Sequence, residues 1–307
     1  MAEEFDRSQP LRPDEYDSRE VELYVDHYRR DPVNEAFLFP AVQQFISEQV
    51  KDKTVVDIGC GLGNFTKCAA DCGAKSVDAF DLSEEMVKAA KQATSDHSNV
   101  TVRVGDVRNM PYSDNSFEVA LSIYITCSVR ENAFIEHYKE LHRILVPGGK
   151  AMVMNFVKPA FDIMYLHQGE NQGDTESKLQ NALVKLPKYP SNEQIMKEFQ
   201  DLHSVMLVSF ALDEQGRLYR ITDASKLVDG QPIWMKSQAM VFSGYYYGDN
   251  FIDDQIKVAG LYIDQIENYF TEERRIAYNS TNPSNRCNST IVQYAPFLLY
   301  HLLKPVN

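Results

Sequence analysis

The chain has 307 residues, of which 44% are hydrophobic and 24% charged, and its formal net charge is −13. This length and composition predict a globular protein with a sizeable buried core. The negative charge disfavours nucleic acid and anionic membranes as partners, because their phosphates would repel such a surface. No apolar run is long enough to span a bilayer, and residues 1–15 lack the apolar centre of a signal peptide, so a cytoplasmic location is expected.

The five cysteines show no spacing typical of a metal or redox site. Reduced thiols are therefore expected, as in a cytosolic protein, and no metal is expected. The cysteines are Cys60, Cys68, Cys72, Cys127 and Cys287.

Aromatic and aliphatic residues recur at helical spacing from Tyr16 to Gln49, with a break near Asp31 and Pro32. Two helices fit this pattern, and residues 1–50 are expected to form a helical cap that packs on the sheet. An alternative interpretation adds a ligand contact, in which Tyr24 or Tyr28 also reaches over a cofactor.

A short β-branched run, Thr54 to Ile58, is typical of a strand buried in a parallel sheet. It contains Asp57 and is followed by glycines at alternate positions, Gly59, Gly61 and Gly63. Glycine permits a sharp turn and removes the side chains that would keep a ligand away from the backbone. A dinucleotide-binding loop would read G-x-G-x-x-G. The spacing here is G-x-G-x-G, and an acid, Asp57, lies two residues before the first glycine. This acid would repel a phosphate but suits a cationic ligand.

The next strand is predicted from Ser76 to Asp81, and Ser83 is placed to cap the helix that follows. An acid at the tip of the second strand is the usual partner of ribose hydroxyls in this kind of sheet. A simple helix-capping role for Asp81 is the alternative.

Three further strands are predicted, from Val100 to Asp106, from Glu118 to Ile125 and from Ala151 to Val157. Residues 144–150 read as a turn before the last of them. The apolar period of Glu131 to Leu145 predicts the crossover helix between the fourth and fifth strands. This alternation predicts an α/β fold with a doubly wound parallel sheet.

Residues 158–247 break the alternation and are too long for a plain crossover. A β-hairpin is predicted between residues 204 and 223. The segment is expected to be an insertion after strand five that covers the carboxyl edge of the sheet as a substrate lid. A second, independent domain is the alternative. The core, residues 51–157, would then be completed by residues 248–307, with a helix from Asp249 to Val258 and two strands, residues 261–270 and 295–305.

Three motifs in this order, DIGCGLG, GDVRNMPYSDNSFEVALS and ELHRILVPGGKAMVMNF, resemble those of Rossmann-like (class I) S-adenosylmethionine (SAM) methyltransferases. The resemblance is strong over residues 50–157 and weaker over residues 245–305. The C-terminal half also resembles small-molecule methyltransferases akin to toxoflavin synthase. The family implies a seven-stranded sheet in the order 3-2-1-4-5-7-6, with the last strand antiparallel and inserted between strands five and six.

The resemblance also implies SAM as the cofactor and assigns residues to its parts. The methionine moiety would lie on the loop formed by Asp57, Gly59, Cys60, Gly61 and Gly63. The adenosine would be bound at the ends of the second and third strands, where Asp81 would bind the ribose hydroxyls. Leu82 and Met86 would flank the adenine. Asp106 would accept a hydrogen bond from the adenine amino group, and the backbone of Val107 would contact the edge of the ring. Ser122 and Tyr124 would lie beside the transferable methyl group, and Tyr28 would complete the cofactor site.

Substrate contacts are expected from Tyr124, His167, Trp234, Tyr245, Tyr246 and Tyr247. His167 could serve as a base or simply be an exposed loop histidine, so no catalytic base is assigned. The implied activity is methyl transfer to a nitrogen or oxygen of a small molecule by a monomer or homodimer. Two alternatives stay open, a protein methyltransferase and a SAM-binding regulator without transfer activity.

Overall fold

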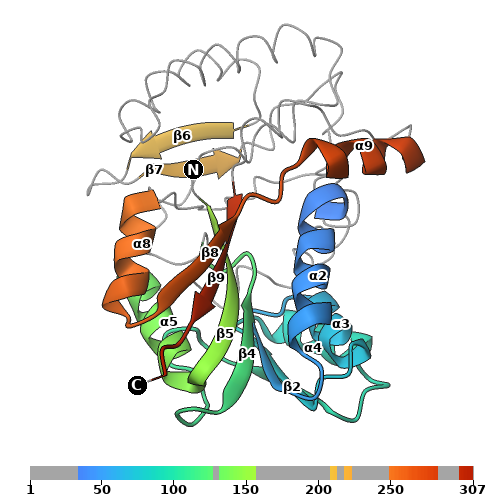
Figure 1. The fold of residues 1–307 in the computed structure, drawn as a ribbon, viewed down its shortest axis with the longest axis vertical. Coiled ribbons are helices and arrows are strands. Elements are labelled where there is room, and N and C mark those ends of the chain that lie inside the picture. Colours follow the sequence, from blue (N-terminus) through green and yellow to red (C-terminus); the bar gives the residue numbers. More distant parts are fainter. Residues whose placement is uncertain are drawn as a thin grey trace, which may run out of the picture.

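The computed structural model describes residues 34–126, 131–156, 208–212, 218–222, 249–282 and 297–306. The strands of its larger sheet are β1 (Thr54–Ile58), β2 (Ser76–Asp81), β3 (Val100–Val104), β4 (Phe117–Ser122), β5 (Leu145–Phe156), β8 (Tyr262–Glu267) and β9 (Phe297–Leu303). They lie side by side in the order β3-β2-β1-β4-β5-β9-β8 (Figure 1). β1 to β5 are parallel, whereas β9 runs antiparallel to both of its neighbours. The expected order 3-2-1-4-5-7-6 is confirmed.

Helices cover both faces of this sheet. One face carries α2 (Phe39–Gln49), α3 (Asn64–Asp71) and α4 (Glu84–Ala93), and the other carries α5 (Glu131–Ile144) and α8 (Asp249–Val258) (Figure 1). A five-residue π-helix, η2 (Asn34–Leu38), leads directly into α2. No helix in the described ranges is both long enough and apolar enough to cross a membrane.

The core has two halves because successive residues of a buried strand point to opposite faces. On β1, Val55 packs with α2 and α3, whereas Val56 and Ile58 pack with α5 and α8. All three side chains are fully buried. Each fully buried aliphatic side chain of this size stabilises the fold by about 1.5–3 kcal/mol. This double burial explains why apolar side chains point to both faces of β1 and do not alternate with exposed polar ones.

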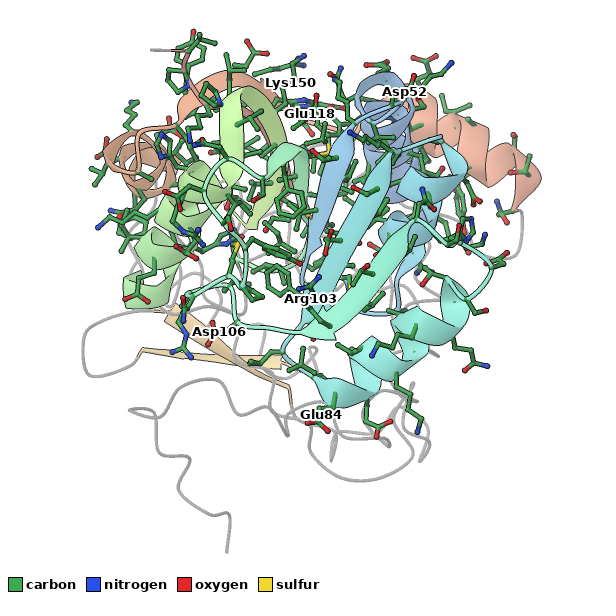
Figure 2. The ribbon with its side chains drawn as sticks, turned by 90° about the horizontal axis from the view of Figure 1, so that it is seen from below. Asp52, Glu84, Arg103, Asp106, Glu118 and Lys150 are labelled. Atoms are coloured by element: carbon green, nitrogen blue, oxygen red, sulfur yellow. The ribbon has the colours of Figure 1, made fainter. Side chains whose placement is uncertain are left out.

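The two ends of the sheet carry different polar groups. At the amino ends of the strands, Glu118 accepts a hydrogen bond from the amide of Thr54 at 3.0 Å. Figure 2 shows Asp52, Glu118 and Lys150 at this end and Asp106 and Glu84 at the opposite, carboxyl end. Ligands of open α/β sheets bind at the carboxyl end.

Several expected strand boundaries are wrong. β3 ends at Val104 and not at Asp106, and β8 ends at Glu267 and not at Phe270. β4 ends at Ser122 and not at Ile125, because Tyr124 adopts a left-handed backbone conformation with φ of +66°. β5 begins at Leu145 and not at Ala151. The residues expected to form a turn instead belong to a strand whose register against β4 shifts between Phe117 and Val119.

Helix α9 (Glu272–Thr281) was not expected from the sequence, although it carries start signals. The side chain of Thr271 accepts a hydrogen bond from the amide of Arg274, and two acids occupy the first turn. Such a cap and such charges both stabilise a helix amino end. By the same chemistry Ser83 caps α4, as expected, by accepting from the amide of Met86.

Within residues 158–247, the predicted insertion, β6 (Val208–Leu212) and β7 (Leu218–Thr222) pair antiparallel. The expected hairpin is confirmed. Figure 1 places it beyond the carboxyl ends of β4 and β5. The described residues do not include the rest of the segment 158–247 or residues 1–33 of the predicted cap. The lid and the domain boundaries therefore stay predictions.

Replacing Gly63 with Ala should destabilise the protein more than replacing Gly73 with Ala. Both glycines have a left-handed backbone, with φ of +80° and +82°, which costs alanine about 1–2 kcal/mol. A Cβ at Gly63 would lie 3.0 Å from Ala90 on α4, whereas the nearest atom at Gly73 is 3.9 Å away. Overpacking should add about 1–3 kcal/mol at Gly63 alone. Urea denaturation of the two variants measures this difference, and equal losses would contradict the close packing of α3 on α4.

Candidate functional site

The loop after β1 contains three glycines that are required for three different reasons. Gly59, Gly61 and Gly63 all have positive φ. A Cβ at Gly59 would lie 1.8 Å from the Cδ1 atom of Ile125, and one at Gly63 would press on α4. At Gly61 no heavy atom of the described structure lies within 4 Å of the Cβ position. Gly61 is therefore the point where a ligand can approach the backbone.

The end of β2 holds this loop in place. Asp81 accepts a hydrogen bond from the amide of Gly61 at 2.9 Å through one carboxylate oxygen. Its other oxygen accepts from the amide of Ser83 at 3.0 Å. The amide of Cys60 donates to the carbonyl of Phe80 at 2.9 Å. Each carboxylate oxygen of Asp81 has a second lone pair, so it can accept a further hydrogen bond from a ligand hydroxyl.

Asp57 lies beneath the loop with an exposed fraction of 2%. Its carboxylate accepts a hydrogen bond of 2.6 Å from the Thr66 hydroxyl on α3. Burial raises the pKa of Asp57 to about 6, and the negative charge of Asp81 adds to this effect. Burial likewise raises the pKa of Asp81. Among the described residues, no cation contributes to the pKa shift of either acid, so the pair favours a cationic ligand.

Cys60 stands between these acids and is partly buried. Burial, followed by the charges of Asp57 and Asp81, raises the pKa of its thiol far above the usual range. The thiol is therefore neutral, and because the thiolate is the reactive form of cysteine, Cys60 is not a redox site. Cys68 and Cys72 are also free, while Cys127 and Cys287 lie outside the described residues.

The predicted adenine contacts lie at the ends of β2 and β3. Met86 is buried, and Leu82 and Val107 are partly buried. Asp106 is engaged by Arg108, whose amide and Nε donate to the same carboxylate at 2.8 and 3.0 Å. An adenine amino group would have to share these oxygens with Arg108.

Ser122, at the end of β4, directs its hydroxyl toward α5. Its Oγ lies 3.1 Å from Nε2 of His137, and both side chains are fully buried. Burial lowers the pKa of His137 to about 4, so the ring is neutral. Nδ1 of His137 has no hydrogen-bond partner within the described ranges. Sequence reasoning missed this pair, although His137 lies three residues after Phe134 on the buried face of α5.

Tyr124 follows two residues later and turns toward the N-terminal cap. Its hydroxyl donates to Oδ1 of Asn34 in η2, and the next residue, Ile125, packs against Gly59. Of the predicted substrate contacts, the structure describes this tyrosine alone. Tyr28 and the remaining predicted substrate residues lie outside the described residues, namely His167, Trp234, Tyr245, Tyr246 and Tyr247.

Residues 55–149 match the protein family described as a methyltransferase domain. The demethylmenaquinone methyltransferase of Staphylococcus epidermidis is 30% identical over 115 residues, which are 37% of this chain and 47% of that protein. The chain thus spans about half the length of the curated relatives it matches.

Solved structures show the same fold at low identity. A SAM-dependent methyltransferase from Mesorhizobium loti aligns with a TM-score of 0.52 and 18% identity, over 86% of this chain and 96% of that one. Geranyl diphosphate C-methyltransferase from Streptomyces coelicolor, solved with S-adenosyl-L-homocysteine, aligns with a TM-score of 0.50 and 12% identity, over 86% of this chain and 76% of that one.

These matches confirm the resemblance to class I SAM-dependent methyltransferases for the part of the chain that contains the glycine loop. The loop can accommodate a positively charged ligand such as SAM, because Gly61 leaves room at the backbone and Asp81 and Asp57 lie next to the loop. The similarity of the C-terminal half to toxoflavin synthase stays a prediction.

Replacing Asp57 with Asn should raise the free energy of unfolding at neutral pH. In the wild type, burial raises the pKa of this carboxyl from 3.8 to about 6, so the folded state binds the proton more tightly. The resulting stability is present at low pH and is lost as pH rises through about 6. At neutral pH the ionised group therefore costs about 3 kcal/mol, a cost that Asn avoids.

Urea denaturation across this pH range measures the effect. The advantage of Asp57→Asn should shrink toward zero as pH falls to the unfolded-state pKa. Asp106→Asn is the matched control, and it should lower the free energy of unfolding at neutral pH. Burial raises the pKa of Asp106, but the hydrogen bonds from Arg108 outweigh this effect, so the pKa is lowered. A stability difference at Asp57 that does not change with pH would show that its charge carries no such cost.

Proposed function

We propose that this protein transfers a methyl group from SAM to a nitrogen or oxygen atom of a small molecule. The observation that carries the proposal is the open backbone at Gly61 between Asp57 and Asp81, inside a segment that matches the methyltransferase domain family. SAM carries a sulfonium and an ammonium group, and a loop next to the buried Asp57 and the partly buried Asp81 stabilises positive charge.

Each part of the cofactor has a proposed partner. Asp81 accepts hydrogen bonds from the ribose hydroxyls while keeping its bond to the Gly61 amide. Leu82 and Met86 flank the adenine, and Asp106 binds its amino group once Arg108 shares the carboxylate. When bound, SAM supplies an electrophilic methyl group, and the chain contributes positioning and exclusion of water.

We assign no general base among the described residues. His137 is buried, neutral and engaged by Ser122, and its pKa of about 4 makes it a weak proton acceptor. A neutral amine needs no base, whereas a hydroxyl acceptor benefits from one. His167 stays a candidate for that role from the sequence.

The preference for a small acceptor rests on two lines of support. The curated relatives over the matched segment include demethylmenaquinone methyltransferases. The insertion after β5 is aromatic, and its hairpin of β6 and β7 lies beyond the carboxyl ends of β4 and β5 (Figure 1). A cover of this kind encloses a small ligand and keeps water from it.

Incubation with methyl-labelled SAM and fractionated cell extract tests the activity. Label on a nitrogen or oxygen of a low-mass compound supports the proposal. Label in protein identifies a protein methyltransferase, and SAM binding without any labelled product identifies a regulator. Label on carbon of a small molecule would keep the reaction class and overturn the assignment of the acceptor atom.

SAM and S-adenosylhomocysteine should bind in calorimetry, whereas NAD should not, because the acids repel a pyrophosphate. Asp81→Ala should weaken SAM binding by roughly 1.5–3 kcal/mol, the range for hydrogen bonds to a charged group. Asp78→Ala is the matched control, since Asp78 lies on the same strand but pairs with Arg103. Equal affinities for SAM in the wild type and Asp81→Ala would remove Asp81 from the site.

Gly61→Val should abolish SAM binding while leaving the protein folded. The added side chain enters the open volume at Gly61 that the ligand needs. Gly73→Val controls for backbone strain, because Gly73 is also left-handed, has no close neighbour and lies beyond the other end of α3. Circular dichroism checks folding, and a folded Gly61→Val protein with wild-type affinity would place the cofactor elsewhere.

A further inference from the structure

Tyr124 has an unusual backbone for its residue type. Three described residues other than glycine have positive φ, namely Asp52, Asn115 and Tyr124. Asp and Asn tolerate this region because their short side chains bond locally, but a bulky residue is strained there. Other contacts must therefore hold Tyr124 in place.

One such contact comes from the N-terminal cap. The Tyr124 hydroxyl donates to Oδ1 of Asn34, the first residue of η2. Asn34 has an exposed fraction of only 4%, and the Tyr124 ring packs against the core on the α2 side of the sheet. This hydrogen bond joins residues that are 90 positions apart in the sequence.

The turn that contains Tyr124 also shapes the glycine loop. Ile125 occupies the space that a side chain at Gly59 would need. On the far side of Ile125, the hydroxyl of Thr126 donates to the carbonyl of Met154 on β5 at 2.8 Å. Ile125 is thus held against Gly59 between two hydrogen bonds, one to η2 and one to β5.

We infer that Asn34 is a positioning residue for the cofactor site, because its bond to Tyr124 keeps the turn after β4 packed on the glycine loop. The inference rests on the proposed function and adds a link between the N-terminal cap and cofactor affinity. Without the bond the strained turn relaxes and Ile125 withdraws from Gly59. The binding-competent loop is then populated less, and the apparent dissociation constant rises by the same factor.

The chain provides a matched control on the same π-helix. The next residue, Glu35, accepts a hydrogen bond of 3.1 Å from the hydroxyl of Tyr278 on α9. This bond also ties η2 to the protein through a tyrosine hydroxyl, but it does not involve the turn after β4. If η2 had a purely structural role, losing either hydrogen bond should change the affinity for S-adenosylhomocysteine equally.

Calorimetry with S-adenosylhomocysteine on the full chain tests the inference, because it needs no acceptor substrate. Asn34→Ala and Tyr124→Phe should each weaken binding roughly three- to tenfold, the factor that one net hydrogen bond supplies. The double variant should bind like either single variant, since both remove the same interaction. Tyr278→Phe should keep wild-type affinity.

Hydrogen exchange without ligand separates this inference from the proposed function. The amides of Cys60 and Gly61, which bond to β2, should exchange faster in Asn34→Ala and Tyr124→Phe but not in Tyr278→Phe. Unchanged exchange in folded Tyr124→Phe protein, or equal effects in Tyr278→Phe, overturns the inference. Failure of the wild type to bind S-adenosylhomocysteine, with the exchange pattern as expected, overturns only the proposed function.

Discussion

The amide of Gly61 bonds to the carboxylate of Asp81, and the neighbouring amide of Cys60 bonds to the carbonyl of Phe80. These two bonds tie the loop after β1 to the end of β2 and fix the left-handed turn that only glycine adopts cheaply. The loop backbone then stays near the carboxyl edge of the sheet with Gly61 uncovered. The open space at Gly61 and the packing of Ile125 on Gly59 both depend on that geometry.

The acids at this edge show how function opposes stability in one place. Asp57 is surrounded by a core that buries apolar residues on both faces of β1, and burial raises its pKa. An ionised carboxylate there is unfavourable until a cation approaches. The hydrogen bond from Thr66 offsets part of this cost. A site that is unfavourable when empty is well suited to a positively charged ligand.

The sequence was sufficient where local chemistry decides the structure. β1 and β2 have the predicted bounds because a β-branched run ends at glycine in one case and at a helix cap in the other. The end of β4 could not be read this way, since Tyr124 has a left-handed backbone there and its hydroxyl bonds to Asn34, 90 residues earlier. The contact between Ser122 and His137 is likewise tertiary. The three glycines looked equivalent in the sequence, and only their neighbours in space distinguish them.

The position of β9 has a consequence for how the chain folds during synthesis. β9 is the last described strand in the sequence, yet it lies between β5 and β8 and pairs with β5 from Lys150 to Phe156. As the chain leaves the ribosome, β5 emerges long before this partner. Its backbone donors and acceptors on that side stay unpaired until residues 297–303 arrive, and such an open edge invites pairing with other chains. The glycine loop can form early, but the sheet that supports it is completed last.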